Sequence, residues 1–143
     1  MKTFSLKIGL VCLALLPLAG AARAAALEGV VVIANEGVPV DSISAAALKD
    51  IYVGKTKYWE GGQSVVIVVL ADSNDAALKQ ASGMDASQFK TFWQRLVFSG
   101  RGQLPRKAED GASLVALVAA TKGAIALAPA DAALSGVKTL EIK

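Results

Sequence analysis

Three stretches of the chain are apolar at nearly every position, which is the pattern of β-strands covered on both faces. They are residues 30–35 (VVVIAN), 64–71 (SVVIVVLA) and 123–130 (GAIALAPA). A fourth stretch, residues 136–143 (GVKTLEIK), alternates between polar and apolar positions instead. This alternation predicts an edge strand of the sheet.

The segments between these strands carry helical signals. Ser44 is a predicted N-cap of a helix whose apolar face holds Leu48, Ile51 and Tyr52, and Gly54 stands where that helix should end. A short helix is predicted over residues 73–80, and another over 111–120, with Asp110 as its N-cap.

The strongest helical pattern begins at Asp85, which forms a predicted capping box with Gln88. Five large apolar residues follow at positions i, i+3, i+4, i+7 and i+8: Phe89, Phe92, Trp93, Leu96 and Val97. The spacing alone explains this stripe, so we interpret it as a core face and not as an aromatic binding face.

Apolar strands alternating with helices predict the α/β class, with a mostly parallel sheet and helices on both faces. The amino-terminal residues are not predicted to belong to this domain. A basic start, an apolar run over residues 8–18 and a small-x-small signal are typical of a secretory signal peptide. We expect residues 1–24 to be this signal, with cleavage as late as residue 26, and residues 25–143 to form one domain.

Removing the signal changes the charge balance. Cleavage after Ala24 removes three of the 15 basic residues, which leaves 12 basic against 12 acidic residues. The basic character of the full chain therefore belongs to the signal, and no nucleic-acid partner is predicted.

The chain has no histidine, and its one cysteine, Cys12, lies in the signal. Histidine triads, cysteine nucleophiles and the common zinc sites are therefore excluded. No cluster has metal-ligand spacing. We predict no catalytic residues, no metal site and no cofactor, and we expect the protein not to be an enzyme. The GKT at residues 54–56 is not a phosphate loop, because it lacks the earlier glycine and follows a helix.

Two segments could contact an anion. The turn at residues 72–75 joins a buried strand to a helix, where backbone N–H groups can bind anions. Its Asp72 and Asp75 are explained more simply as residues that cap the helix and complement its dipole. The loop SGRGQLPR (99–106) combines glycines with Arg101 and Arg106, and arginine binds oxyanions in a bidentate way. A solvated basic loop is the simpler alternative.

Read together, several stretches resemble the solute-binding proteins of phosphate-type ABC transporters. They are SISAAALKDIYVGKTKYWEGGQSVVIVV, FWQRLVFSGRGQLPR and ALVAATKGAIALAPA. The positions that carry the likeness are Gly54, Lys55, Trp59, Gly100, Arg101, Gly102, Pro105, Gly123 and Ile125. The family's full-length members hold an oxyanion between two α/β lobes. This chain is about half as long and resembles a single lobe of that periplasmic-binding-protein (type II-like) fold.

The resemblance implies where a ligand would lie. In the phosphate binders a glycine-rich turn after the equivalent strand holds the anion. Here that turn reads Asp72-Ser73-Asn74-Asp75, without the glycines and with an added carboxylate. We expect ligand contacts from two segments, and the residues are Ser73, Asn74, Ser99, Gly100, Arg101 and Gly102.

Two functions follow from the resemblance. The first is a periplasmic protein that binds a small oxyanion such as phosphate, weakly or with a partner lobe or a second copy in a homodimer. The second is an interaction protein that kept the lobe fold and lost the ligand. Its partner would be a membrane transporter, a sensor, a porin or another copy of itself.

Overall fold

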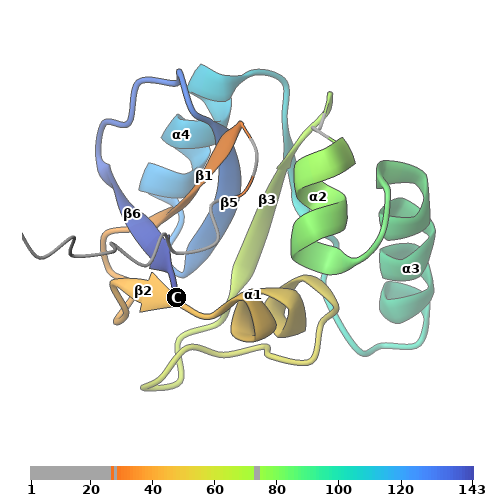
Figure 1. Cartoon of the computed structure of the whole chain (residues 1–143). Coiled ribbons are helices and arrows are strands. Elements are labelled where there is room, and N and C mark those ends of the chain that lie inside the picture. Colours follow the sequence, from red (N-terminus) through yellow and green to blue (C-terminus); the bar gives the residue numbers. More distant parts are fainter. Residues whose placement is uncertain (1–26, 28, 73–74) are drawn as a thin grey trace, which may run out of the picture.

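A six-stranded sheet with helices on both faces forms the protein (Figure 1). The structure is a computed structural model that describes Leu27, residues 29–72 and residues 75–143. The predicted signal peptide and the predicted site residues Ser73 and Asn74 lie outside the described residues.

The described elements follow the predicted order closely. They are β1 (Val30–Asn35), β2 (Ser42–Ile43), α1 (Ala45–Tyr52), β3 (Val66–Leu70), α2 (Asp75–Ser82), α3 (Ala86–Phe98), β4 (Arg106–Ala108), α4 (Gly111–Ala120), β5 (Ala124–Pro129) and β6 (Val137–Ile142).

The strand order across the sheet is β2-β6-β1-β5-β3-β4. β1 pairs antiparallel with both of its neighbours, β5 and β6. The remaining pairs are parallel, so every strand except β1 runs in the same direction. The predicted α/β class, with a mostly parallel sheet and helices on both faces, is confirmed.

One strand prediction is wrong, and two short strands were missed. β6 is not an edge strand, because β2 pairs with it on its outer side. β2 has only two residues, too few to give a periodic pattern. β4 begins at Arg106, the last residue of the predicted loop, and it forms the opposite edge by pairing with β3. Strands of two or three residues are fixed by their partners across the sheet and not by their own pattern.

The two faces of the sheet bury different residues. Helices α1, α2 and α3 cover one face, where Ile67 and Ile125 pack with Phe89 and Trp93. Helix α4 covers the other face, where Val68 packs in a second cluster. Neighbours along β3 therefore point to opposite helical layers, as the period of two in a strand requires.

Three of the predicted helix starts, at Ser44, Asp85 and Asp110, are confirmed by hydrogen bonds. The Ser44 hydroxyl accepts from the backbone N–H three residues later at 3.0 Å. Asp85 accepts from the N–H of Gln88 at 2.8 Å, and the Gln88 side chain accepts from the N–H of Asp85 at 3.1 Å. Asp110 accepts from the N–H of Ser113 at 2.7 Å. No helix in the described part of the chain is long and apolar enough to cross a membrane.

Candidate functional site

Strand β3 has a hollow at each of its ends. Ser64 to Ile67 line a pocket at its amino end, which we call the basic pocket. Val68 to Leu70, together with Asp72, line a separate hollow at its carboxyl end, which we call the apolar cavity. The two hollows differ in chemistry, so each is described in turn.

The basic pocket has a volume of about 330 Å³ and three cationic side chains in its lining. These are Lys57, Arg101 and Arg106, and no Asp or Glu is among the described residues that line it. Hydroxyl and amide groups add hydrogen-bonding capacity, and they come from Thr56, Tyr58, Ser64 and Gln103. This set of donors, with three positive charges, suits a small anion.

The end of α1 fixes one wall of the basic pocket. Gly54 has a φ of +73°, and its N–H donates to the carbonyl of Ile51 at 3.1 Å. The next N–H, that of Lys55, reaches back to the carbonyl of Asp50 at 2.8 Å. These two bonds form a Schellman motif, which ends the helix and turns the chain toward Thr56 and Lys57.

The end of α3 forms a second Schellman motif beside the same pocket. Gly100 has a φ of +71°, and its N–H donates to the carbonyl of Val97 at 3.0 Å. The N–H of Arg101 donates to the carbonyl of Leu96 at 3.0 Å. A glycine is needed here for the left-handed conformation, and the arginine after it is held at the pocket by its own backbone.

The loops that follow α1 and α3 both pack against the side chains of Trp93 and Leu96. A Cβ on Gly54 would lie 2.6 Å from Leu96 Cδ2, and a Cβ on Gly102 would lie 3.1 Å from Trp93 Cζ3. The indole of Trp93 is buried and also forms part of the pocket wall. Gly54 and Gly102 are therefore explained by close packing against α3.

Of the four predicted site residues that the structure describes, three line one hollow. Gly100, Arg101 and Gly102 line the basic pocket, as a group. Ser99 does not line it, and its hydroxyl donates to the carbonyl of Leu96 at 2.8 Å. Ser73 and Asn74 are not described, but their neighbour Asp72 lies at the other end of β3. Asp72 and the group Gly100, Arg101 and Gly102 thus lie at opposite ends of β3.

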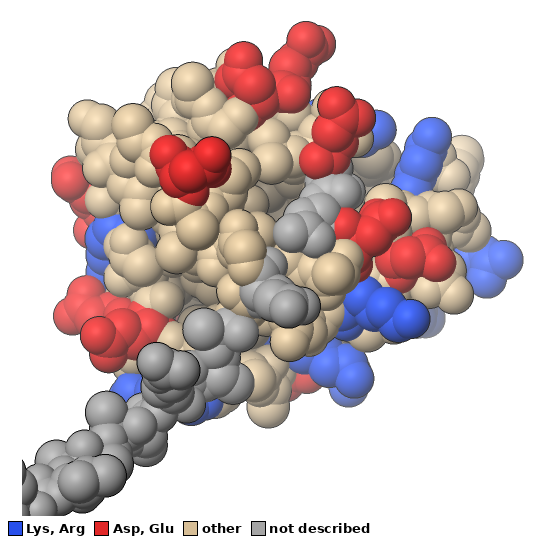
Figure 2. All heavy atoms as spheres, turned by 45° about the horizontal axis from the view of Figure 1, so that its top comes forward, with Lys and Arg blue, Asp and Glu red and all other residues tan. Residues whose placement is uncertain are grey.

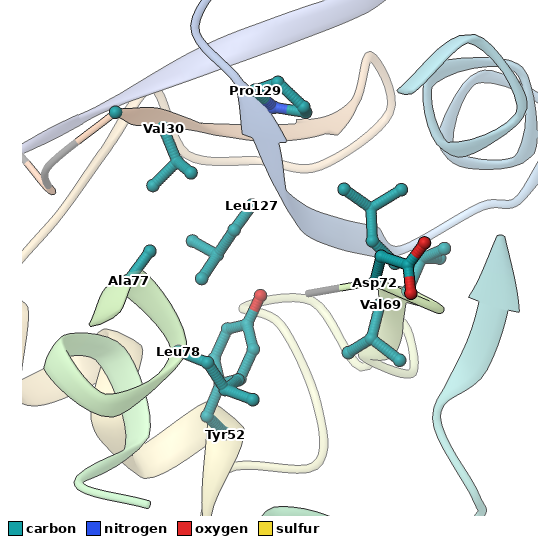
Figure 3. Close-up of a pocket in the computed structure, with 11 residues that line it drawn as sticks. Val30, Tyr52, Val69, Asp72, Ala77, Leu78, Leu127 and Pro129 are labelled. Atoms are coloured by element: carbon teal, nitrogen blue, oxygen red, sulfur yellow. The ribbon is translucent and has the colours of Figure 1, made fainter. Parts of the chain in front are cut away.

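The apolar cavity at the carboxyl end of β3 has a volume of about 170 Å³. Figure 3 shows Tyr52 of α1 with its hydroxyl pointing between Leu127 of β5 and Asp72. Tyr52 is fully buried, and its hydroxyl has no hydrogen-bond partner among the described residues. Burial raises the pKa of the Tyr52 phenol well above its ordinary value, so the hydroxyl keeps its proton. Sequence patterns placed Tyr52 in the core and gave no sign of this polar group facing a cavity.

Charge at this end of β3 does not favour an anion. Asp72 and Asp75 are exposed there, and Asp75 lies in the first turn of α2 as predicted. Its carboxylate accepts from the N–H of Ala86 at 3.3 Å, which ties the starts of α2 and α3 together. Figure 2 shows further acidic side chains over the upper face, with Lys and Arg mostly to the right and below. Within the described ranges, no three acidic side chains are close enough together to hold a metal ion.

Comparisons with known proteins bear on the fold. No family model matches the sequence, and no curated protein matches it either. Among the solved structures that match, two have a TM-score of 0.54. One is described as a phosphate ABC transporter substrate-binding protein from Clostridium perfringens, with bound phosphate, and is 20% identical. The other is an ABC-type phosphate transport receptor from Vibrio cholerae, 17% identical.

The matches cover 80% of this chain, but only 44% and 46% of those two chains. The chain therefore spans less than half the length of the proteins that it matches. At this level of identity the likeness establishes the fold, which is that of a single lobe of a periplasmic-binding-protein-like protein.

Proposed function

We propose that the protein is a solute-binding-type lobe that binds a small oxyanion such as phosphate in the basic pocket. The observation that carries this proposal is the placement of Lys57, Arg101 and Arg106 around one pocket whose described lining has no carboxylate. The fold is shared with a substrate-binding protein described with bound phosphate, which supports a small oxyanion as the ligand class. It does not support this location, because the family resemblance implies an anion at the turn that follows β3.

The binding is expected to be weak. All three cationic residues are exposed, so salt screens their attraction to the anion. Arg106 also donates a long hydrogen bond of 3.5 Å to the hydroxyl of Thr121, which holds its guanidinium only loosely. We expect a Kd of about 1 mM at low ionic strength, which is about −4 kcal/mol.

The test is an NMR titration of the mature protein with sodium phosphate, against sodium chloride at matched ionic strength. Saturable shifts are expected at the amides of Gly100, Arg101 and Gly102. The Arg101→Gln variant should weaken phosphate binding about 5-fold or more, because it removes one charge-assisted contact. Arg95→Gln makes the same charge change on the exposed side of α3, outside the pocket lining, and should leave the affinity unchanged.

Equal weakening by Arg95→Gln and Arg101→Gln would mean that phosphate responds to overall charge and has no site. Shifts of the same size with chloride would also overturn the proposal. The setting that we propose is the periplasm of a Gram-negative bacterium, reached through the cleaved signal at residues 1–24. The proposed partner is a membrane transporter or a sensor that binds the lobe when its ligand is bound.

A second candidate function rests on exposed apolar side chains beside the same pocket. Tyr58 is 62% exposed and Leu104 is 54% exposed, and both line the basic pocket. Exposed apolar groups around a pocket are typical of an interaction surface. The alternative is therefore a non-enzymatic interaction protein that pairs with a second copy and binds no solute.

Sedimentation velocity over a range of concentrations distinguishes the two. If the alternative holds, we expect a dimer that dissociates in the Leu104→Ser variant. We also expect no saturable chemical-shift changes when phosphate is added. Phe98→Ser is the matched control, since Phe98 is 93% exposed but does not line the pocket. A monomer at all concentrations would remove this alternative.

A further inference from the structure

We infer that the apolar cavity at the carboxyl end of β3 is a binding site for a small, uncharged, mostly apolar molecule that carries one hydroxyl group. The ligand class is that of a phenol. This site is separate from the basic pocket, because the two hollows share no lining residue. The inference therefore does not depend on the proposed oxyanion function.

The buried hydroxyl of Tyr52 is the first observation. Buried polar groups in folded proteins almost always have a partner, and an unpaired one calls for an explanation. Tyr52 is fully buried, its hydroxyl points into the cavity, and no described residue pairs with it (Figure 3). The protonated hydroxyl can both donate and accept, so it suits the hydroxyl of a ligand.

The size and walls of the cavity are the second observation. Its volume is about 170 Å³, and a cavity of about 150 Å³ with apolar walls is large enough to hold benzene. Besides Tyr52 of α1, four other elements contribute apolar walls, with Val30 from β1, Val69 from β3, Leu78 from α2 and Leu127 from β5. A ring can therefore pack against these apolar side chains with its hydroxyl directed toward Tyr52.

The charge of the described lining disfavours an anionic ligand. Asp72 is the charged side chain among the described residues that line the cavity, and no Lys or Arg is among them. A carboxylate at the rim repels phosphate and carboxylate ligands, but it tolerates a neutral hydroxyl. The apolar cavity and the basic pocket thus select ligands of different classes.

The test uses phenol and benzene as matched probes, with binding to the mature protein measured by isothermal titration. For each variant the quantity compared is the ratio of the benzene Kd to the phenol Kd. Tyr52→Phe removes the hydroxyl and keeps the ring, so the ratio should fall about 5-fold. Tyr58→Phe makes the same chemical change on an exposed ring outside the cavity and should leave the ratio unchanged.

A second variant tests the location without touching Tyr52. Ala77 is fully buried and lines the cavity, so the larger side chain of Ala77→Val should fill part of it. The binding of phenol and of benzene should then weaken by similar factors. The inference is overturned if neither probe binds saturably to the unmodified protein. It is also overturned if the ratio is the same with Tyr52 and with Phe at this position, since the hydroxyl then has no role in binding.

Discussion

The indole Nε1 of Trp93 donates a 3.0 Å hydrogen bond to the backbone carbonyl of Tyr52. Trp93 forms part of the wall of the basic pocket, and Tyr52 presents its hydroxyl to the apolar cavity. The ring of Phe89 lies between them, 6.1 Å from each of the other two rings. The two hollows are therefore separate in chemistry but are held by one cluster of side chains from α1 and α3.

This cluster is expected to be important for stability. Trp93→Phe removes the hydrogen bond to Tyr52 and leaves a small void beneath Gly102. We expect the free energy of unfolding to fall by about 2–4 kcal/mol, measured by urea denaturation. Phe98→Leu, at a 93% exposed position on the same helix, should change it by less than about 0.5 kcal/mol. Equal effects of the two changes would contradict the role given to Trp93.

A second prediction concerns two glycines with similar backbone conformations. Gly123 has a φ of +77°, and a Cβ there would lie 2.0 Å from the carbonyl oxygen of Ser64. Gly61 has a φ of +95° and open space around it. Gly61→Ala should cost about 1–2 kcal/mol from backbone strain alone.

Gly123→Ala adds a clash with the segment that leads into β3, and the same glycine's carbonyl accepts from Val66 and from the Trp59 indole. We expect it to cost about 4 kcal/mol or more, or to prevent folding. The stabilities of the two variants are compared by thermal unfolding under the same conditions. A Gly123 variant as stable as the Gly61 variant would show that the contact with Ser64 relaxes easily.

The sequence predicted most of the fold because its local signals agree with the final structure. The N-caps at Ser44, Asp85 and Asp110 and the continuous apolar strands are local features, and all of them were found. The position of β6 inside the sheet was not predictable from its alternation. It depends on pairing with Ser42 and Ile43, which lie about a hundred residues away along the chain.

The site was predicted less well, for a physical reason. The residues that carry the family resemblance are explained largely by the backbone: Gly54 and Gly100 end helices, and Trp59 donates to the carbonyl of Gly123. Residues at such positions are needed for the fold, so their presence does not identify the ligand. Conversely, the hydroxyl of Tyr52 faces a cavity only because β3, β5 and α2 meet around it, and no spacing in the sequence reveals that.

A third prediction concerns acid stability. The N–H and the hydroxyl of Ser113 hydrogen-bond the Asp110 carboxylate and hold its pKa below the ordinary value. The folded pKa thus lies below the unfolded one, which is about 3.9. The stabilisation is present above the unfolded pKa and is lost as the pH falls through the folded pKa.

Asp110→Asn keeps an N-cap but cannot titrate. Urea unfolding of both proteins over a pH series isolates the effect, because the other ionisable groups cancel in the difference. That difference should be constant above about pH 5 and should change as the pH falls below about 4. A constant difference down to about pH 2 would mean that the pKa of Asp110 is the same in the folded and unfolded states.

The last prediction decides which end of β3 holds the anion. The five residues of β3 rise about 3.3 Å each, so its two ends are separated by more than the Debye length of about 8 Å at physiological salt. Asp72→Asn removes a charge at the carboxyl end, far from the basic pocket. If phosphate lies beside Arg101, its affinity at physiological salt should change less than about 2-fold. If it lies at the turn predicted from Ser73 and Asn74, removal of the neighbouring carboxylate should strengthen binding several-fold, while Arg101→Gln should have no effect.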